Sequence, residues 1–151
     1  MAKRAALLLL LLLLLLLGAA CGGRSAEEEI RERLQRVGGA VTGKDLATVE
    51  EFISERYADG RGNDKQALTA LLAAHFAESR SLYLWTKVQR LELTDSGAEV
   101  TVFAAMAEQP IEKPALDADF QRVDLVLVEE GAADWKLLRA DWRRARLGDL
   151  R

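Results

Sequence analysis

Residues 43–60 read GKDLATVEEFISERYADG and place a short amphipathic helix between two turns. Thr42 to Asp45 form the first turn. The apolar residues that follow recur at the three- and four-residue spacing of a buried helix face: Leu46, Val49, Phe52 and Ile53. The second turn, SERYADGRGN at 54–63, is rich in turn formers and leaves room for one short strand around residues 56–58. The stretch therefore predicts a short helical connection between longer elements.

A longer helix is expected before this stretch. Ser25 opens the motif SAEE, in which serine at the N-cap and Glu28 three residues later form a capping box. Apolar residues at helical spacing follow it: Ile30, Leu34, Val37 and Val41. The pair Gly38-Gly39 weakens the helix, so we expect it to bend there or to end before Gly43.

A third helix is expected after the second turn, ending near Glu78. Asn63 and Gln66 repeat the capping-box spacing at its start. Its predicted apolar face contains Leu68, Leu71, Leu72, His75 and Phe76.

After Arg80 the pattern changes to that of strands. Residues 81–94, the turn DSG and residues 98–109 predict one hairpin, and residues 119–130, the turn GAAD and residues 135–144 predict another. Both prolines lie in the connection at 109–118, where no strand interior is expected.

Alternation along the third strand separates two faces. Arg122 and Asp124 share one face with Phe120 and two valines, and the other face carries Val123, Leu125 and Leu127. Arg139 and Asp141 alternate in the same way on the last strand. These charged residues either line a polar binding site or pair across strands at the surface.

The element order, residues 43–60 and the sequence DWKLLRADW at 134–142 resemble the nuclear transport factor 2-like family over residues 26–145. The resemblance implies an α+β cone, in which three N-terminal helices pack on a curved antiparallel sheet of about four long strands and enclose a pocket. Members of this family include isomerases, dehydratases, cyclases, transport adaptors and noncatalytic domains, and many dimerise through the exposed sheet face. The fold alone therefore does not give the function.

The N-terminus has the layout of a secretory signal peptide. Lys3 and Arg4 precede eleven leucines and the small residues at 18–20, a run too short for an ordinary membrane span. The sequence LGAAC resembles the lipobox of bacterial lipoproteins, which implies removal of residues 1–20 and lipidation of Cys21. The alternatives are an ordinary signal peptide and an uncleaved signal anchor. We expect residues 21–25 to be a lipidated N-terminus with a short tether, and residues 146–151 to be a C-terminal tail.

This organisation predicts an exported protein anchored to the membrane through Cys21. Gly22 follows the cysteine where inner-membrane retention would use aspartate, so a host with two membranes would place the protein on its outer membrane, facing the periplasm. Without Lys3 and Arg4 the chain carries 19 basic and 24 acidic residues, a net charge of −5 that argues against nucleic acid as a partner.

Two residues are candidate general bases. His75 is the only histidine and would enter the pocket from the apolar face of the third helix; otherwise it is a partly buried residue with local hydrogen bonds. Asp59 lies roughly where the resemblance to ketosteroid-isomerase-like members places a carboxylate base, but residues 26–42 contain no tyrosine donor, and a turn residue before Gly60 is the alternative. The sequence offers no conventional metal ligand set and no cofactor motif.

The candidate binding residues are Trp85, Phe103, Arg122, Asp124 and Arg139. Aromatic residues of this kind line ligand pockets or cover the core of a small sheet. We expect a noncatalytic domain that binds a small apolar ligand or an envelope partner protein. The alternatives are a small isomerase or hydro-lyase with His75 or Asp59 as its base, and a structural envelope protein that acts as a homodimer.

Overall fold

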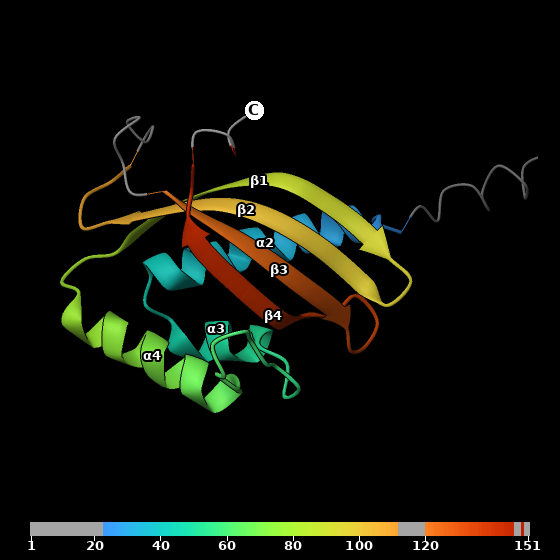
Figure 1. The fold of residues 1–151 in the computed structure, drawn as a ribbon, viewed down its shortest axis with the longest axis horizontal. Helices are drawn as coiled ribbons and strands as arrows, with labels where there is room; N and C mark the ends of the chain where they lie inside the picture. The colour runs from blue at the N-terminus through green and yellow to red at the C-terminus, as the bar shows by residue number, and fades with distance from the viewer. Residues whose placement is uncertain (1–22, 112–119, 147–148, 150–151) are drawn as a thin grey trace, which may run out of the picture.

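A computed structural model of the chain describes residues 23–111, 120–146 and 149 (Figure 1). The predicted signal peptide, Cys21 and part of the proline-containing connection lie outside the described residues. The described part is an α+β domain of three helices followed by four strands: α2 (Ala26–Thr42), α3 (Leu46–Phe52), α4 (Lys65–Glu78), β1 (Tyr83–Thr94), β2 (Gly97–Ala107), β3 (Gln121–Glu129) and β4 (Trp135–Arg144).

The four strands form an open antiparallel sheet in the order β1-β2-β3-β4. Val102 of β2 stands opposite Val88 of β1 and Val123 of β3, and Val123 stands opposite Trp142 of β4. Both predicted hairpins are therefore present. The register shifts between Val88 and Arg90 of β1 and again between Val126 and Leu127 of β3, and such shifts mark bulges or similar irregularities.

Helix α2 begins as the sequence predicts. The Ser25 hydroxyl accepts a hydrogen bond from the Glu28 N–H at 3.2 Å, and the Glu28 carboxylate accepts one from the Ser25 N–H at 3.1 Å. The helix continues through Gly38-Gly39 and ends at Thr42 with Gly43 as its C-cap. Tertiary packing of its apolar face outweighs the low helix propensity of the two glycines.

Two local predictions between α3 and α4 were wrong. Residues 56–58 form no strand in the described structure, only an isolated bridge between Ala58 and Asp64. The N-cap of α4 is Asp64, whose carboxylate accepts from the Ala67 N–H at 2.8 Å. Asn63 precedes the cap, and its side-chain amide donates to Asp59 at 2.9 Å.

The helices all lie on one face of the sheet, as Figure 1 shows. Helix α2 crosses beneath the strands, α3 packs between α2 and β4, and α4 packs against α3. Ile30 of α2 and Leu127 of β3 are completely buried between these layers. A smaller cluster of Ala40, Val49, Phe76 and Leu82 holds α4 to the end of α2.

The edge of β4 is covered by the chain that follows α3. The Ser54 N–H donates to the Leu137 carbonyl at 3.0 Å, and the Ala58 N–H donates to the Leu138 carbonyl at 3.2 Å. These bonds occupy groups that an uncovered edge strand would offer to another chain. No helix within the described residues is both long and apolar enough to cross a membrane.

Candidate functional site

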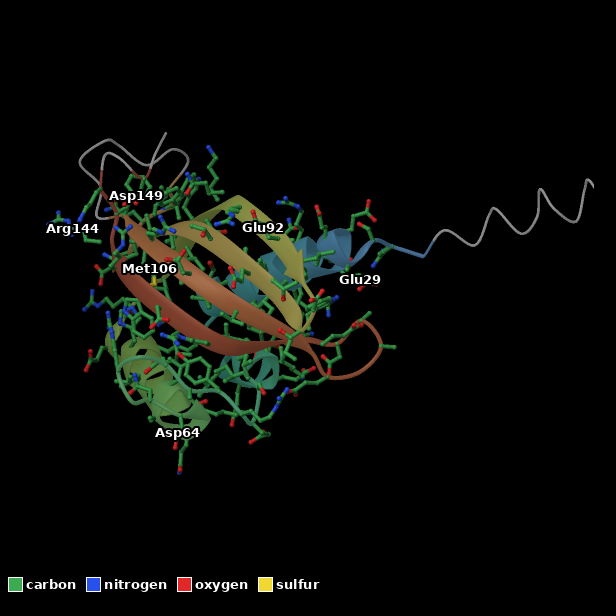
Figure 2. All side chains as sticks on the ribbon, turned by 45° about the vertical axis from the view of Figure 1, so that its right-hand side comes forward. Glu29, Asp64, Glu92, Met106, Arg144 and Asp149 are labelled. Atoms are coloured by element: carbon green, nitrogen blue, oxygen red, sulfur yellow. The ribbon has the colours of Figure 1, made fainter. Side chains whose placement is uncertain are left out.

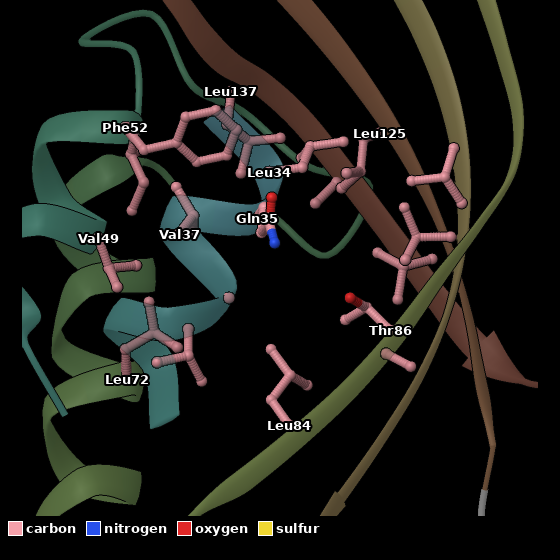
Figure 3. A pocket seen from close by; sticks show the side chains of 18 of the residues that line it. Leu34, Gln35, Val37, Val49, Phe52, Leu72, Leu84, Thr86, Leu125 and Leu137 are labelled. Carbon is pink, nitrogen blue, oxygen red and sulfur yellow. The ribbon is translucent and has the colours of Figure 1, made fainter. Parts of the chain in front are cut away.

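A cavity of about 600 Å³ lies between the helices and the inner face of the sheet (Figure 3). Its walls come from all three helices and all four strands. The residues that line it are Arg31, Leu34, Gln35, Val37, Gly38, Val41, Val49, Phe52, Ile53, Leu68, Leu72, Leu84, Thr86, Val88, Val102, Ala104, Met106, Val123, Leu125, Leu137 and Ala140.

The cavity exists because small residues occupy positions on facing walls. Gly38 of α2 has no side chain, and a Cβ built there would have as its nearest neighbour the Leu84 Cδ2 of β1, at 3.9 Å. Ala104 of β2 and Ala140 of β4 supply only a methyl group each from the sheet. Larger side chains at these positions would fill the space that the surrounding residues leave.

Three of the lining residues are polar: Arg31 and Gln35 of α2 and Thr86 of β1. All three are exposed to solvent, as is Met106, so they mark the mouth of the cavity. Arg31 and Gln35 are four residues apart and therefore share one face of α2. Figure 3 shows Gln35 on the α2 side and Thr86 on the β1 side, with the Thr86 hydroxyl directed toward the space between them.

Arg31 is the single titratable side chain among the described residues that line the cavity. Its guanidinium remains protonated at physiological pH and so cannot act as a general base. The described lining supplies neither a carboxylate nor an imidazole, a phenol or a thiol. The arrangement can hold an apolar molecule, but these side chains offer no group for proton abstraction.

His75 does not enter the cavity. Its side chain is exposed in the last turn of α4, and its carbonyl accepts from the Ser79 N–H at 3.1 Å. Leu71, one turn earlier on the predicted apolar face, is 55% exposed. Helix α4 packs against α3 and not against the sheet, so only Leu68 and Leu72 of this helix reach the cavity.

Asp59 also lies outside the cavity lining, in the turn before α4. Its carboxylate accepts hydrogen bonds from the side chain and backbone of Asn63, both at 2.9 Å, from the Arg61 N–H at 2.9 Å and from the Tyr57 hydroxyl at 3.1 Å. These donors, the Asn63 amide first, lower the pKa of Asp59 to about 2. Burial and the hydrogen bond to Asp59 raise the pKa of Tyr57. A carboxylate so stabilised organises a turn and is a weak base.

Arg122 and Asp124 lie on the outer face of the sheet. The Arg122 guanidinium donates to Asp124 at 3.0 to 3.1 Å, and the Thr101 hydroxyl donates to the same carboxylate at 2.8 Å. Burial raises the pKa of Asp124, but the hydrogen bonds from Arg122 and Thr101 outweigh it and the net shift is downward. Asp149, labelled in Figure 2, adds a second carboxylate at the end of the sheet. Its Oδ1 atom lies 3.3 Å from Nη1 of Arg122 and 2.7 Å from Nη2 of Arg143.

The other three candidate binding residues share this outer face. Arg139 pairs with Asp141 at 2.5 Å, and Trp85 makes an edge-to-face contact with Phe120 at 5.8 Å between ring centroids. Phe103 is only 4% exposed, between its strand partners Lys87 and Arg122. The structure therefore places these predicted residues on the face of the sheet opposite the cavity, and of the five only Arg122 and Asp124 are joined by a hydrogen bond or ion pair in the described structure.

Within the described residues no group of histidine, cysteine, aspartate and glutamate side chains is arranged to hold a metal ion.

No protein-family profile and no curated protein sequence matches the chain. Solved structures do match its fold. A nuclear transport factor 2-like protein of unknown function from Pseudomonas putida superposes with a TM-score of 0.60, covering 80% of this chain and 88% of its own, at 18% identity. This chain has a nuclear transport factor 2-like fold.

Two further structures support the same fold. A proposed scytalone dehydratase from Novosphingobium aromaticivorans gives a TM-score of 0.65 over 80% of this chain and 84% of its own, at 10% identity. The Bdellovibrio bacteriovorus protein Bd1075 gives 0.67 over 80% of this chain at 9% identity, and this chain spans only 41% of its length. The neighbours are compatible with a ligand-binding domain.

In this nuclear transport factor 2-like fold, the sequence reasoning missed the residues at the cavity mouth. Thr86 alternates with Leu84 and Val88 on the inner face of β1, so its position follows from the strand period. Arg31 precedes Leu34 by three residues and so borders the apolar stripe of α2. These signals place both residues beside the core, but only the assembled layers show that a cavity opens between them.

Proposed function

We propose that this protein is a noncatalytic binding protein, and that its ligand is a small apolar molecule held between α2 and the inner face of the sheet. The observation that carries the proposal is the cavity of about 600 Å³, whose described lining is apolar except for three residues at the mouth. Ligand-binding clefts usually have volumes of about 300–1,000 Å³, mostly apolar walls and a few polar groups. The ligand would then lie inside the cone of helices and curved sheet that the sequence resemblance implies.

The absence of a base from the described lining favours binding over catalysis. An isomerase or hydro-lyase needs a group within hydrogen-bond reach of the proton that it removes. His75 and Asp59 are both outside the described lining. The dehydratase named among the structural neighbours has only 10% sequence identity to this chain, so its activity is not carried over.

Two adjacent glycines of α2 allow a matched test of the cavity. Gly38 faces the cavity, whereas Gly39 is exposed and a Cβ built there meets nothing within 4 Å. Replacement of either glycine by leucine raises the helix propensity of α2 by the same amount. Only Gly38→Leu places a side chain in the proposed binding space.

The experiment uses the neutral fluorescent probe N-phenyl-1-naphthylamine with the full chain. The wild-type protein and Gly39→Leu should bind one equivalent and enhance its fluorescence, and Gly38→Leu should bind it at least ten-fold more weakly. Circular dichroism should show that both variants are folded. Undiminished binding by a folded Gly38→Leu variant would place the probe elsewhere and overturn the proposal.

We also propose that the protein is exported and held to the membrane by a lipid on Cys21, with the outer membrane as its location in a host with two membranes. The sequence LGAAC supports this proposal, as does the short segment between Cys21 and the capped start of α2 at Ser25. Intact-mass measurement of protein extracted from membranes should give the mass of the chain from Cys21 plus diacylglycerol. Cys21→Ser should lack that addition, and a lipid-bearing mass in the variant would refute the site.

A further inference from the structure

We infer that the ligand is an amphiphilic monoanion, with an apolar body in the cavity and a carboxylate head bound at the mouth by Arg31, Gln35 and Thr86. This inference rests on the proposed function and adds the chemical class of the ligand. It is argued from the charge, hydrogen bonding and position of these three side chains.

Arg31 differs from the other arginines on and beside α2. Arg24 lies 2.6 Å from Glu32, Arg36 lies 3.6 Å from Glu32, and Arg33 lies 3.6 Å from Glu51. Arg31 has neither a hydrogen bond nor an ion pair with any residue that the structure describes. Its positive charge is therefore available at the cavity mouth.

The charge at the mouth is not balanced by the described cavity wall. No aspartate or glutamate belongs to the described lining, and every other lining residue is neutral. Glu27 is four residues before Arg31 on α2, but no ion pair within 4.0 Å joins the two residues in the described structure. A ligand with one negative charge complements this mouth, whereas a second negative charge would find no second cation in the described lining.

Gln35 and Thr86 complete the head-group site with neutral donors. Neither side chain has a hydrogen-bond partner among the described residues, and both lie at the exposed end of an otherwise apolar space. A carboxylate has two oxygens that accept several hydrogen bonds, and it matches the planar fork of an arginine guanidinium. Gln35 and Thr86 lie on opposite sides of the space in Figure 3, and in this proposal the Gln35 amide N–H and the Thr86 hydroxyl donate to the carboxylate.

The apolar walls extend inward from these donors. Val37 and Val41 belong to the α2 wall, and Val88, Val102 and Leu125 belong to the sheet wall. A molecule with its head at the mouth would therefore place its tail or rings against side chains that gain free energy from losing contact with water. The single polar end and the apolar interior together define an amphiphile.

The test compares two probes that differ only in the head group: dansylaminoundecanoic acid and its methyl ester. The wild-type full chain should bind the acid about five-fold more tightly than the ester, because an exposed charge pair contributes a factor of that order. Arg31→Gln should remove this preference and leave the affinity for the ester unchanged. Arg36→Gln, a substitution on the same helix outside the described cavity lining, should retain the preference.

The outcomes separate this inference from the proposed function. Equal wild-type affinity for acid and ester, or a preference that survives in Arg31→Gln, overturns the head-group assignment and leaves the apolar cavity as the binding site. Failure of both probes, together with failure of N-phenyl-1-naphthylamine, overturns the binding function itself. A melting temperature of Arg31→Gln close to that of the wild type shows that the change acts on the ligand and not on folding.

Discussion

The two sides of the sheet differ in whether their charged side chains have hydrogen-bond partners. On the outer face, Thr101, Arg122, Asp124 and Asp149 bond to one another. The inner face contributes no charged residue to the described cavity wall, and the one charged residue of that wall, Arg31 of the facing helix α2, has no hydrogen bond or ion pair with a described residue. A cluster of charged residues is thus a poor indicator of a binding site when its members satisfy each other, whereas one unpaired charge beside an apolar space is a better one.

The largest expected effect is on the free energy of unfolding, which should depend more on inward-facing than on outward-facing residues. Two neighbouring residues of β3 test this difference. Leu127 faces inward and is fully buried, whereas Val126 faces outward and is half-buried. Leu127→Ala should lower the free energy of unfolding by about 2–5 kcal/mol through lost burial and a new void. Val126→Ala should cost no more than about 1 kcal/mol. Urea unfolding followed by tryptophan fluorescence measures both, and equal losses would contradict the assignment of faces.

A smaller effect is expected from the outer charge cluster. Asp124→Ala removes the acceptor of Arg122 and Thr101, and because the carboxylate is partly exposed to solvent the loss should be about 1 kcal/mol. Glu99→Ala is a matched control, since Glu99 is exposed on the neighbouring strand and makes neither a hydrogen bond nor an ion pair within 4.0 Å in the described structure, only a longer-range attraction to Arg90. Its free energy of unfolding should stay within about 0.5 kcal/mol of the wild type. A loss as large as that of Asp124→Ala would show that the cluster contributes nothing specific.

A pH-dependent effect is expected at the turn that Asp59 organises. The pKa of Asp59 is lowered to about 2 in the folded chain, below the value of about 3.9 expected when unfolded. The stabilisation is therefore complete above about pH 4 and is lost as the pH falls toward 2. Asp59→Asn should be less stable than the wild type at pH 7, and the difference between their urea midpoints should narrow steadily as the pH falls from about 4 through about 2. A constant difference across this range would contradict the role of the carboxylate charge.

The smallest expected effect on stability is at Arg31. Because this side chain has no described partner, Arg31→Gln should change the free energy of unfolding by less than about 0.5 kcal/mol. Thermal unfolding without ligand measures the change. A clear loss of stability would mean that Arg31 supports the fold, and would remove the contrast between the two faces.

Much of the fold could be predicted from local patterns. Ser25 and Glu28 mark the start of α2 because their hydrogen bonds are local, and the turn at Asp95 and Ser96 separates two strands of the expected lengths. The N-cap of α4 could not be assigned in this way. Asn63 and Asp64 are both good capping residues, and only the structure shows that Asp64 accepts from the first turn of α4 while Asn63 donates to Asp59.

The site was harder to predict because it is made of residues that sequence reasoning assigns to the core. Strand alternation correctly separated Arg122 and Asp124 from Val123 and Leu125, but it does not say which face has unfilled space beside it. That space depends on Gly38 and Ala104, which come from different elements, and the sequence identifies Gly38 only as a weak point of the helix. His75 was misplaced because helix periodicity does not show which neighbour a helix packs against.

The paired glycines of α2 also bear on how a ligand could reach the cavity. Each glycine in a helix interior costs roughly 1 kcal/mol relative to alanine, so the C-terminal turn of α2 unfolds locally at a lower free energy than the turn around the buried Ile30. Amide protons near Gly43 should accordingly exchange with solvent faster than that of Leu34. This part of the cavity wall then opens at a lower free energy than the turn around Ile30, which gives the proposed ligand a route that does not require the sheet to separate from α3.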